Sequence, residues 1–411
     1  MEKGEDRDHK KLGRELGLFA FSDTVGKGLP LWLPKGTTIR RELERFIVDE
    51  EIRRGYLHVR TPDIAKLELY KKSGHYPHFK DSMYAPITID DEEFMLRPMA
   101  CPHHFELYLS KPHSYRELPM RIAELAQLYR YEQSGELMGL QRVRTFCLAD
   151  AHIICKDEEQ AVEEISKALD LIEYVTSVFN LKLDTDYRYR LSLGDKKNTK
   201  KYYKNDSAWE KGEDLLRKLM KNRGSKFEEV KDEAAFYGPK IDIQMKNANS
   251  KEDTAFTVQY DFCMPEKFNL NYIGEDGNEH LAFVIHRSSI GAIERIMAFL
   301  IEKYAGAFPL WLSPVQVKVI PVRTNHNEYA KQVFELLKEN NIRAELDDKD
   351  ENLGTKVRDA KTNKIPYWIV IGDKEIEAKK ITLESRESGQ LGQMLKEELV
   401  KKLLEEIKNK K

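Results

Sequence analysis

Apolar residues recur at helical spacing in four stretches of the chain, and these stretches predict four helices. They cover residues 8–18, 38–54, 158–180 and 291–305. In each stretch, apolar side chains three or four positions apart line one face, and charged side chains cover the opposite face. Gly55 follows the second stretch directly and is expected to end that helix.

Shorter stretches, in which apolar residues alternate with polar ones or β-branched residues gather, predict strands. The predicted strands lie within residues 56–64, 118–132, 141–155, 235–245, 254–262 and 279–288. Residues 95–110 (MLRPMACPHHFELYLS) predict a strand, a turn and a helix in succession.

The pattern changes twice along the chain. Residues 192–235 are rich in Lys and Glu and only weakly periodic, which predicts an insertion of helices and loops. Residues 305–314 contain two prolines and no charged side chain, which favours a domain boundary. Beyond this point strands and helices alternate in the βαβ manner. We therefore expect one domain over residues 1–310 and a second over residues 311–411.

Length and composition narrow the class of protein. A chain of 411 residues suits two or three domains. Its 68 Lys and Arg against 70 Asp and Glu give a net charge of −2, so any nucleic acid must bind to local patches. The four cysteines lie far apart, which argues for a reducing compartment. No apolar run approaches the roughly 20 residues of a membrane span, and the first residues lack the apolar core of a signal peptide. We expect a cytoplasmic protein with no membrane partner.

The common nucleotide-binding and hydrolase motifs are absent from the sequence, including G-x-x-x-x-G-K-[ST], G-x-S-x-G and H-E-x-x-H. A different set of residues in the sequence could bind phosphate. Arg130-x-Glu132 and Arg142-x-x-x-Phe146 lie on a predicted hairpin. Arginine forks bind phosphate oxygens in a bidentate manner, and an aromatic ring can stack on a base. A surface hairpin with ordinary ion pairs is the alternative interpretation.

Three side chains far apart in the sequence could hold a metal ion. Cys101, His152 and His286 do not have the close spacing of a zinc finger. Three ligands from distant elements leave a fourth position for substrate, which is the arrangement of a catalytic site. A buried cysteine and two hydrogen-bonded histidines are the alternative. Asp150 lies two residues before His152 on a predicted strand, so both side chains should share a face.

Several of these motifs resemble the class II aminoacyl-tRNA synthetases. The Arg130–Phe146 hairpin is similar to their motif 2, Gly291-Ala-Ile-Glu-Arg295 to motif 3, and residues 38–62 to motif 1, the dimer element. The segments MACPHHF, RVRTFCLADAHII, AFYGPKID, TVQYDF and VIHRSSIGAIER resemble the threonyl-tRNA synthetase family in particular. The resemblance implies an α+β fold: an antiparallel sheet flanked by helices, followed by an α/β anticodon-binding domain.

The same resemblance implies roles for individual residues and a set of partners. The implied catalytic residues are Arg130, Arg142 and Arg295, and the implied ATP-binding set adds Glu132, Phe146, Thr257 and Gln259. The implied substrate-binding residues are Asp150, Tyr237 and Lys240, the zinc ligands Cys101, His152 and His286, and the anticodon contacts Arg358 and Glu375. The implied ligands and partners are one Zn²⁺ per subunit, ATP with Mg²⁺, L-threonine, tRNA(Thr) and a second copy of the chain.

A regulator without charging activity, a zinc hydrolase and a class II synthetase of another specificity are the alternative functions. A synthetase-like regulator that has lost charging is expected to have damaged motif arginines, yet Arg130, Arg142 and Arg295 are present. A zinc hydrolase could use Asp150 as its base, but the motif arginines would then be unexplained. Prolyl or seryl specificity is the closest competitor within class II. The resemblance begins by about Asp8, so we expect no N-terminal editing domain. Leu33 stands where many relatives have a histidine, so no protein base can be named for the transfer step.

Overall fold

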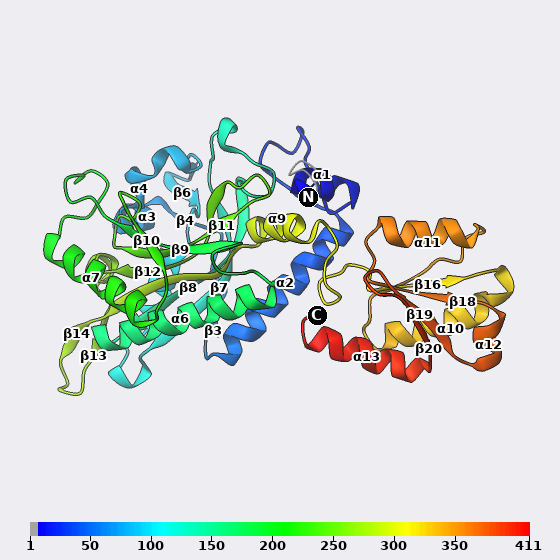
Figure 1. Ribbon diagram of the computed structural model, residues 1–411. Helices are drawn as coiled ribbons and strands as arrows, with labels where there is room; N and C mark the ends of the chain where they lie inside the picture. Colours follow the sequence, from blue (N-terminus) through cyan, green and yellow to red (C-terminus); the bar gives the residue numbers. More distant parts are fainter. Residues whose placement is uncertain (1–6) are drawn as a thin grey trace. The chain divides into compact units, whose positions relative to one another are not determined.

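The computed structural model describes residues 7–411, which divide into two compact units (Figure 1). The larger unit contains Phe21–Pro30 and Glu44–Phe299. The other contains the described residues up to Ala20 together with Leu31–Leu43 and Leu300–Lys411.

The larger unit is built on an eight-stranded sheet. Its strands, in spatial order, are β10 (Phe227–Lys231), β9 (Tyr187–Leu193), β11 (Lys240–Lys246), β12 (Glu252–Asp261), β15 (Phe283–Ala292), β8 (Thr145–Cys155), β7 (Met120–Tyr129) and β3 (Leu57–His58). All neighbours pair antiparallel except the outermost pairs, β10 with β9 and β3 with β7, which are parallel. The predicted antiparallel sheet is therefore confirmed.

Helix α6 (Glu158–Val178) packs against β8, β12 and β15 of this sheet (Figure 1). Asp157 caps its first turn, because the carboxylate accepts a hydrogen bond from the backbone N–H of Gln160 at 2.8 Å. Its buried face repeats at helical spacing and includes Ile165, Leu169 and Ile172. Burying this stripe fixes the helix on the sheet and leaves the opposite sheet face for other elements.

The other elements that lie wholly or partly in this unit are short apart from two long helices. They are α2 (Pro34–Arg53), β4 (Ile64–Lys66), α3 (Leu67–Ser73), α4 (His75–His78), β5 (Ile87–Ile89), β6 (Glu92–Leu96), α5 (Cys101–Tyr108), α7 (Asp206–Asn222), α8 (Met264–Phe268), β13 (Asn271–Ile273), β14 (Glu279–Leu281) and α9 (Ile293–Tyr304). Among them, β4, β6 and β5 form a small sheet.

The other unit contains a five-stranded mixed sheet with helices. Its strands, in spatial order, are β17 (Ala344–Leu346), β16 (Val317–Pro321), β18 (Tyr367–Ile371), β19 (Ile381–Ser385) and β20 (Gly389–Met394). Its further elements are α1 (His9–Glu15), β1 (Phe19–Ala20), β2 (Leu31–Trp32), α10 (Asn327–Glu339), α11 (Leu353–Thr362), α12 (Asp373–Ala378) and α13 (Lys396–Lys408).

Two segments differ from the sequence-based expectation. Residues 192–235 contain the helix α7, but they also contain the strand β10, which extends the main sheet. Exposed charged side chains on this edge strand obscured the alternation of apolar and polar residues that predicts a strand. In the C-terminal region the short helix α12 and then a hairpin, β19 and β20, lie between β18 and the terminal helix, where βαβ alternation was expected. The strand β20 is mostly exposed, and four of its six residues are glycine or glutamine, so its sequence does not look like a strand.

The bounds of one helix and one strand also differ from the predicted bounds. The helix predicted from residue 38 begins at Pro34, a residue that suits the first position of a helix. The strand predicted over residues 56–64 is reduced to Leu57–His58. In residues 7–411, no helix is long and apolar enough to cross a bilayer.

Candidate active site

Strand register places polar residues in two rows across one face of the main sheet. The first row runs from β8 to β11 and contains His152, His286, Gln259 and Lys240. The second row lies two residues away on each strand and contains Asp150, Ser288, Thr257 and Asp242. Side chains two residues apart on a strand share a face, so both rows point to the same side of the sheet.

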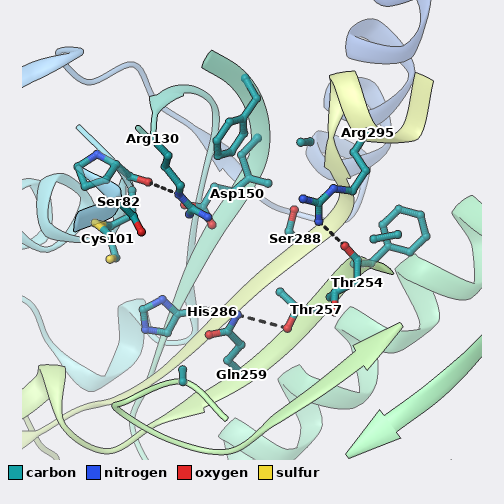
Figure 2. A pocket seen from close by; sticks show the side chains of 18 of the residues that line it. Ser82, Cys101, Arg130, Asp150, Thr254, Thr257, Gln259, His286, Ser288 and Arg295 are labelled. Carbon is teal, nitrogen blue, oxygen red and sulfur yellow. Dashed lines mark hydrogen bonds between the residues drawn. The ribbon is translucent and has the colours of Figure 1, made fainter. Parts of the chain in front are cut away.

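Both rows line a cavity of about 530 Å³. Every residue predicted to bind the metal, the nucleotide or the amino acid lines it: Cys101, Arg130, Glu132, Arg142, Phe146, Asp150, His152, Tyr237, Lys240, Thr257, Gln259, His286 and Arg295. Figure 2 shows Cys101 and Arg295 on opposite sides of the view, with Asp150 between them. We call Cys101, His152, His286 and Asp150 the cysteine–histidine end, and Arg130, Arg142, Phe146 and Arg295 the arginine end. Arg130 lies beside Asp150, where the two ends meet (Figure 2).

The cysteine–histidine end brings three possible metal ligands together. One donor atom each from Cys101, His152 and His286 lies within 4.8 Å of the others, and all three side chains are buried. Burial, then the negative charges of Asp150 and Asp261, raises the pKa of the Cys101 thiol. Burial also lowers the pKa of His152. A divalent cation held by these atoms would lower the pKa of the Cys101 thiol and favour the thiolate.

Side chains around His286 hold its ring firmly. Its Nε2 lies 2.6 Å from the Oδ2 of Asp261, a fully buried carboxylate. The ring of Tyr237 stacks on it, with centroids 4.6 Å apart and an angle of 18° between the planes. Sequence analysis did not select Asp261, although it lies two residues after Gln259 on the same strand.

The arginine end is held by backbone carbonyls. The Nε of Arg130 donates to the carbonyl oxygen of Pro98 at 3.1 Å, and its guanidinium lies 5.1 Å from the centroid of the Phe146 ring (Figure 2). Burial lowers the pKa of Arg130, and the charge of Glu132 opposes that effect. Arg142 is more exposed, with 39% of its side chain accessible, and its nearest acid is Glu136 at 3.8 Å.

Arg295 lies in the first turn of α9 and enters the cavity from the side opposite to Cys101. Its Nε donates to the Gln141 carbonyl at 3.0 Å and its Nη1 to the Thr254 carbonyl at 2.6 Å (Figure 2). Gly291 allows α9 to begin here. Its φ is +72°, and a Cβ atom would lie 2.1 Å from the Ala255 carbonyl oxygen, so only glycine fits.

A hydrogen-bonded chain links the middle of the two rows. Tyr237 donates to the Oε1 of Gln259 at 2.6 Å, and Gln259 donates to Thr257 at 3.2 Å (Figure 2). Thr257 in turn donates to Asp242 at 2.9 Å, and the Nζ of Lys240 lies 3.0 Å from the same carboxylate. Asp242 is fully buried and was missed by sequence analysis, because nothing in the pattern distinguishes it from a charge that pairs with a neighbour.

Comparison with known proteins decides the family. Residues 84–304 match the tRNA synthetase class II core domain (G, H, P, S and T), and residues 316–406 match the anticodon binding domain. A crystal structure of the RNA binding domain of threonyl-tRNA synthetase from Cryptosporidium parvum is 33% identical, with a TM-score of 0.91 over 97% of this chain and 98% of that chain. The chain belongs to the threonyl-tRNA synthetase family of class II synthetases. This confirms the predicted resemblance and fold class.

Curated relatives of this threonyl-tRNA synthetase family member are longer. The threonine–tRNA ligases of Geobacillus kaustophilus and Streptococcus agalactiae are 49% and 51% identical to it over 100% of this chain. The chain spans 63% of the length of these two relatives. The predicted division into residues 1–310 and 311–411 stays a prediction.

The two predicted anticodon contacts lie on different helices of the C-terminal region. Arg358, on α11, is exposed. Glu375, on α12, is only partly exposed, and its carboxylate accepts hydrogen bonds from Gly372 N at 2.9 Å and Thr382 Oγ1 at 2.6 Å. Burial of Glu375 is outweighed by these hydrogen bonds, which lower its pKa. Arg358 is therefore the more accessible of the two.

Proposed function

We propose that this protein is a threonine–tRNA ligase, which activates L-threonine with ATP and transfers it to the 3′ end of tRNA(Thr). The observation that carries the proposal is a cavity lined both by buried sulfur and nitrogen donors and by several arginines. The donors suit a zinc ion that would take the amino and hydroxyl groups of threonine, and the arginines suit a triphosphate.

In the first step, the carboxylate oxygen of threonine attacks the α-phosphorus of ATP, and pyrophosphate leaves as the new P–O bond forms. Arg130 stabilises the negative charge that develops on the α-phosphate, because the carbonyl oxygen of Pro98 holds its guanidinium in position. The more exposed Arg142 binds the γ-phosphate, with Mg²⁺ assisting. Phe146 and Arg295 hold the two faces of adenine by stacking and cation–π contact.

The remaining residues of the two rows orient the reactants. Glu132 orients the adenine, while Thr257 and Gln259 contact the ribose. Asp150 accepts a hydrogen bond from threonine, and Tyr237 and Lys240 complete the substrate contacts. Lys240 is held by Asp242, so its ammonium is fixed in position before substrate arrives.

Cys101, His152 and His286 fit a Zn²⁺ ion. One sulfur and two nitrogen donors lie within 4.8 Å of one another, so they would hold the ion with three protein ligands and leave the rest of its coordination to substrate. A zinc ion bound here would act as a Lewis acid that takes the amino and hydroxyl groups of threonine. These three residues would hold it, and Asp150 lies on the adjacent row of the same sheet face.

The second step is attack on threonyl-adenylate by a terminal ribose hydroxyl of tRNA(Thr), which releases AMP. Arg358 and Glu375 are proposed to contact the anticodon. A homodimer formed through α2 and the following strand, and a location in the cytoplasm, complete the proposal.

Aminoacylation tests this function directly. Purified protein is incubated with ATP, Mg²⁺ and transcripts of tRNA(Thr), tRNA(Pro) or tRNA(Ser), in separate reactions with labelled L-threonine, L-proline or L-serine. We expect an ester on tRNA(Thr) alone and none on tRNA(Thr) whose terminal ribose has been oxidised. Charging of tRNA(Pro) with proline or of tRNA(Ser) with serine, without threonylation, would overturn the proposal.

A further inference from the structure

The two histidines of the cysteine–histidine end use different ring nitrogens for their hydrogen bonds. In His286 the Nε2 atom is engaged, 2.6 Å from Asp261 Oδ2. In His152 the Nδ1 atom is engaged, 2.8 Å from the Nδ1 of His104. A neutral imidazole has one donor and one acceptor nitrogen, so each contact decides which nitrogen keeps a free lone pair.

Asp261 can only accept a hydrogen bond when it is ionised. Its other oxygen, Oδ1, already accepts from the backbone N–H groups of Cys263 at 2.8 Å and Met264 at 2.9 Å. These two donors hold the carboxylate in place. The hydrogen between Asp261 and His286 therefore belongs to Nε2, and the Nδ1 of His286 keeps its lone pair.

His152 is anchored indirectly, through His104. The Nε2 of His104 lies 3.1 Å from Glu124 Oε2, and Glu124 also accepts from the Oγ1 of Thr61 at 2.7 Å and from the Nη2 of Arg97 at 3.2 Å. A carboxylate with these donors accepts from His104, so the proton of His104 is on Nε2. Its Nδ1 must then accept from the Nδ1–H of His152, which leaves the Nε2 of His152 free.

Local structure explains why His104 reaches this position. Cys101 and His104 lie three residues apart on α5, so they share one face of the helix. Glu124 of β7 pairs in register with Asp150 of β8, on the same sheet face as His152. One helix face and one strand therefore supply both a candidate ligand and the support behind another ligand.

We propose that Glu124 and His104 are positioning residues that present His152 through Nε2, while Asp261 presents His286 through Nδ1. The inference rests on the proposed zinc role of this end of the cavity. His104 then stays behind His152 and does not become a fourth ligand. A fourth protein ligand would close the site, whereas three leave the position that substrate needs.

Zinc affinity of designed variants tests the role of His104. Zinc chloride is titrated against a chromophoric chelator in the presence of the full chain. We expect His104→Leu, which removes the acceptor, to weaken zinc binding about 10–100-fold, the range found for lost outer-shell partners. His104→Asn places an amide oxygen near the former Nδ1 and should recover at least part of that loss.

The neighbouring His103 provides a matched control. It lies on the same helix and is buried, but it packs near Tyr70, with ring centroids 6.3 Å apart. His103→Leu should bind zinc as the original chain does. Zinc binding by His104→Leu within twofold of the original chain, or an equal loss in His103→Leu, would overturn the inference.

A spectroscopic measurement on the unaltered protein avoids any problem of folding. Long-range ¹H–¹⁵N correlation spectra of ¹⁵N-histidine-labelled, zinc-bound protein distinguish the two modes of imidazole coordination. We expect one histidine bound through Nε2 and one through Nδ1, and neither should be the histidine whose signals disappear in His104→Asn. Coordination of both through the same ring atom, or coordination by His104, would contradict the inference.

The two proposals fail in different ways. Zinc bound with the expected ring atoms in a protein that does not activate threonine would remove the proposed function and keep the positioning assignment. Threonine activation with both histidines bound through the same ring atom would do the reverse. Absence of zinc uptake would overturn both the metal role and the inference.

Discussion

The two ends of the cavity hold their polar side chains by different means. At the cysteine–histidine end, buried carboxylates are the final anchors: Asp261 contacts His286, and Glu124 reaches His152 through His104. At the arginine end, backbone carbonyls accept the hydrogen bonds of Arg130 and Arg295, and Asp253 lies 3.6 Å from Arg295 as an ion-pair partner. Both ends are fixed before any ligand arrives, but the net charge that they offer to a ligand differs.

The difference follows from the chemistry that each end is proposed to perform. An imidazole must be kept neutral and in one tautomer to bind a metal, and a carboxylate that accepts its N–H achieves this. An arginine that binds phosphate must keep its charge available, and a neutral carbonyl orients the guanidinium without cancelling that charge. The guanidinium of Arg130 is therefore oriented by a neutral group, while the charges of Glu132 and Asp150 oppose the lowering of its pKa by burial.

The largest effect is expected when the cysteine–histidine end loses its metal. Removal of zinc, or Cys101→Ser, should lower threonine-dependent ATP–pyrophosphate exchange at least about 10³-fold, because several kcal/mol of substrate binding and activation are lost. Zinc content is measured beside exchange. Cys155→Ser, a buried cysteine on β8 that does not line the cavity, is the matched control and should retain both. A zinc-free chain with full exchange would contradict the metal role.

The second prediction concerns the loss of one guanidinium from the arginine end. Arg130→Ala should reduce exchange about 10²–10³-fold, as expected for the loss of one preorganised donor to a developing charge. Arg130→Lys keeps the charge without the planar fork and should fall in between. Zinc content should not change in either variant, which separates the two ends. Arg144→Ala, close in sequence and stacked on Tyr131, serves as the control. Equal losses in the Arg130 and Arg144 variants would show that the hairpin as a whole is responsible.

The third prediction concerns Asp242, a buried carboxylate in the middle of the cavity that holds Lys240, one of the proposed substrate-binding residues. Asp242→Asn keeps the shape of the side chain but removes the charge that holds Lys240. We expect a loss of about tenfold in kcat/KM for ATP in the exchange reaction, the lower part of the range for a charged hydrogen bond. Ser192→Ala removes one hydrogen bond from an uncharged hydroxyl to Asp242, 2.8 Å long, but leaves the charge of Asp242 in place and should cost less. A greater loss in Ser192→Ala would contradict the role given to Asp242.

The smallest effect on activation is expected from the C-terminal region. Arg358→Ala should leave exchange within about twofold of the original chain, because exchange needs no tRNA. Charging of tRNA(Thr) should fall about 5–10-fold, the cost of roughly 1 kcal/mol or slightly more for one exposed hydrogen bond. Steady-state charging rates at several tRNA concentrations measure it. Unchanged charging would remove Arg358 from the proposed anticodon contacts.

Sequence patterns located the residues of the cavity better than the supports behind them. Cys101, Arg130 and Arg295 belong to short motifs, so their residue types and spacing are visible in one sequence. His104 was passed over, and Asp261 resembled any charge at the end of a strand. Their partners are far away in sequence and meet only through strand register and the start of α5. The same reasoning applies to the fold: strongly periodic α6 was predicted closely, whereas the exposed edge strands β10 and β20 were not.

Amino-acid-dependent ATP–pyrophosphate exchange, measured in parallel with all twenty amino acids, tests the proposed function most directly. We predict the highest kcat/KM for threonine. Serine lacks one methyl group and should be lower by about 10–200-fold, and valine, which leaves the site for the hydroxyl unpaired, should be lower by about 10⁴–10⁵-fold. Exchange that is strongest with proline, or that does not distinguish valine from threonine, would contradict the account.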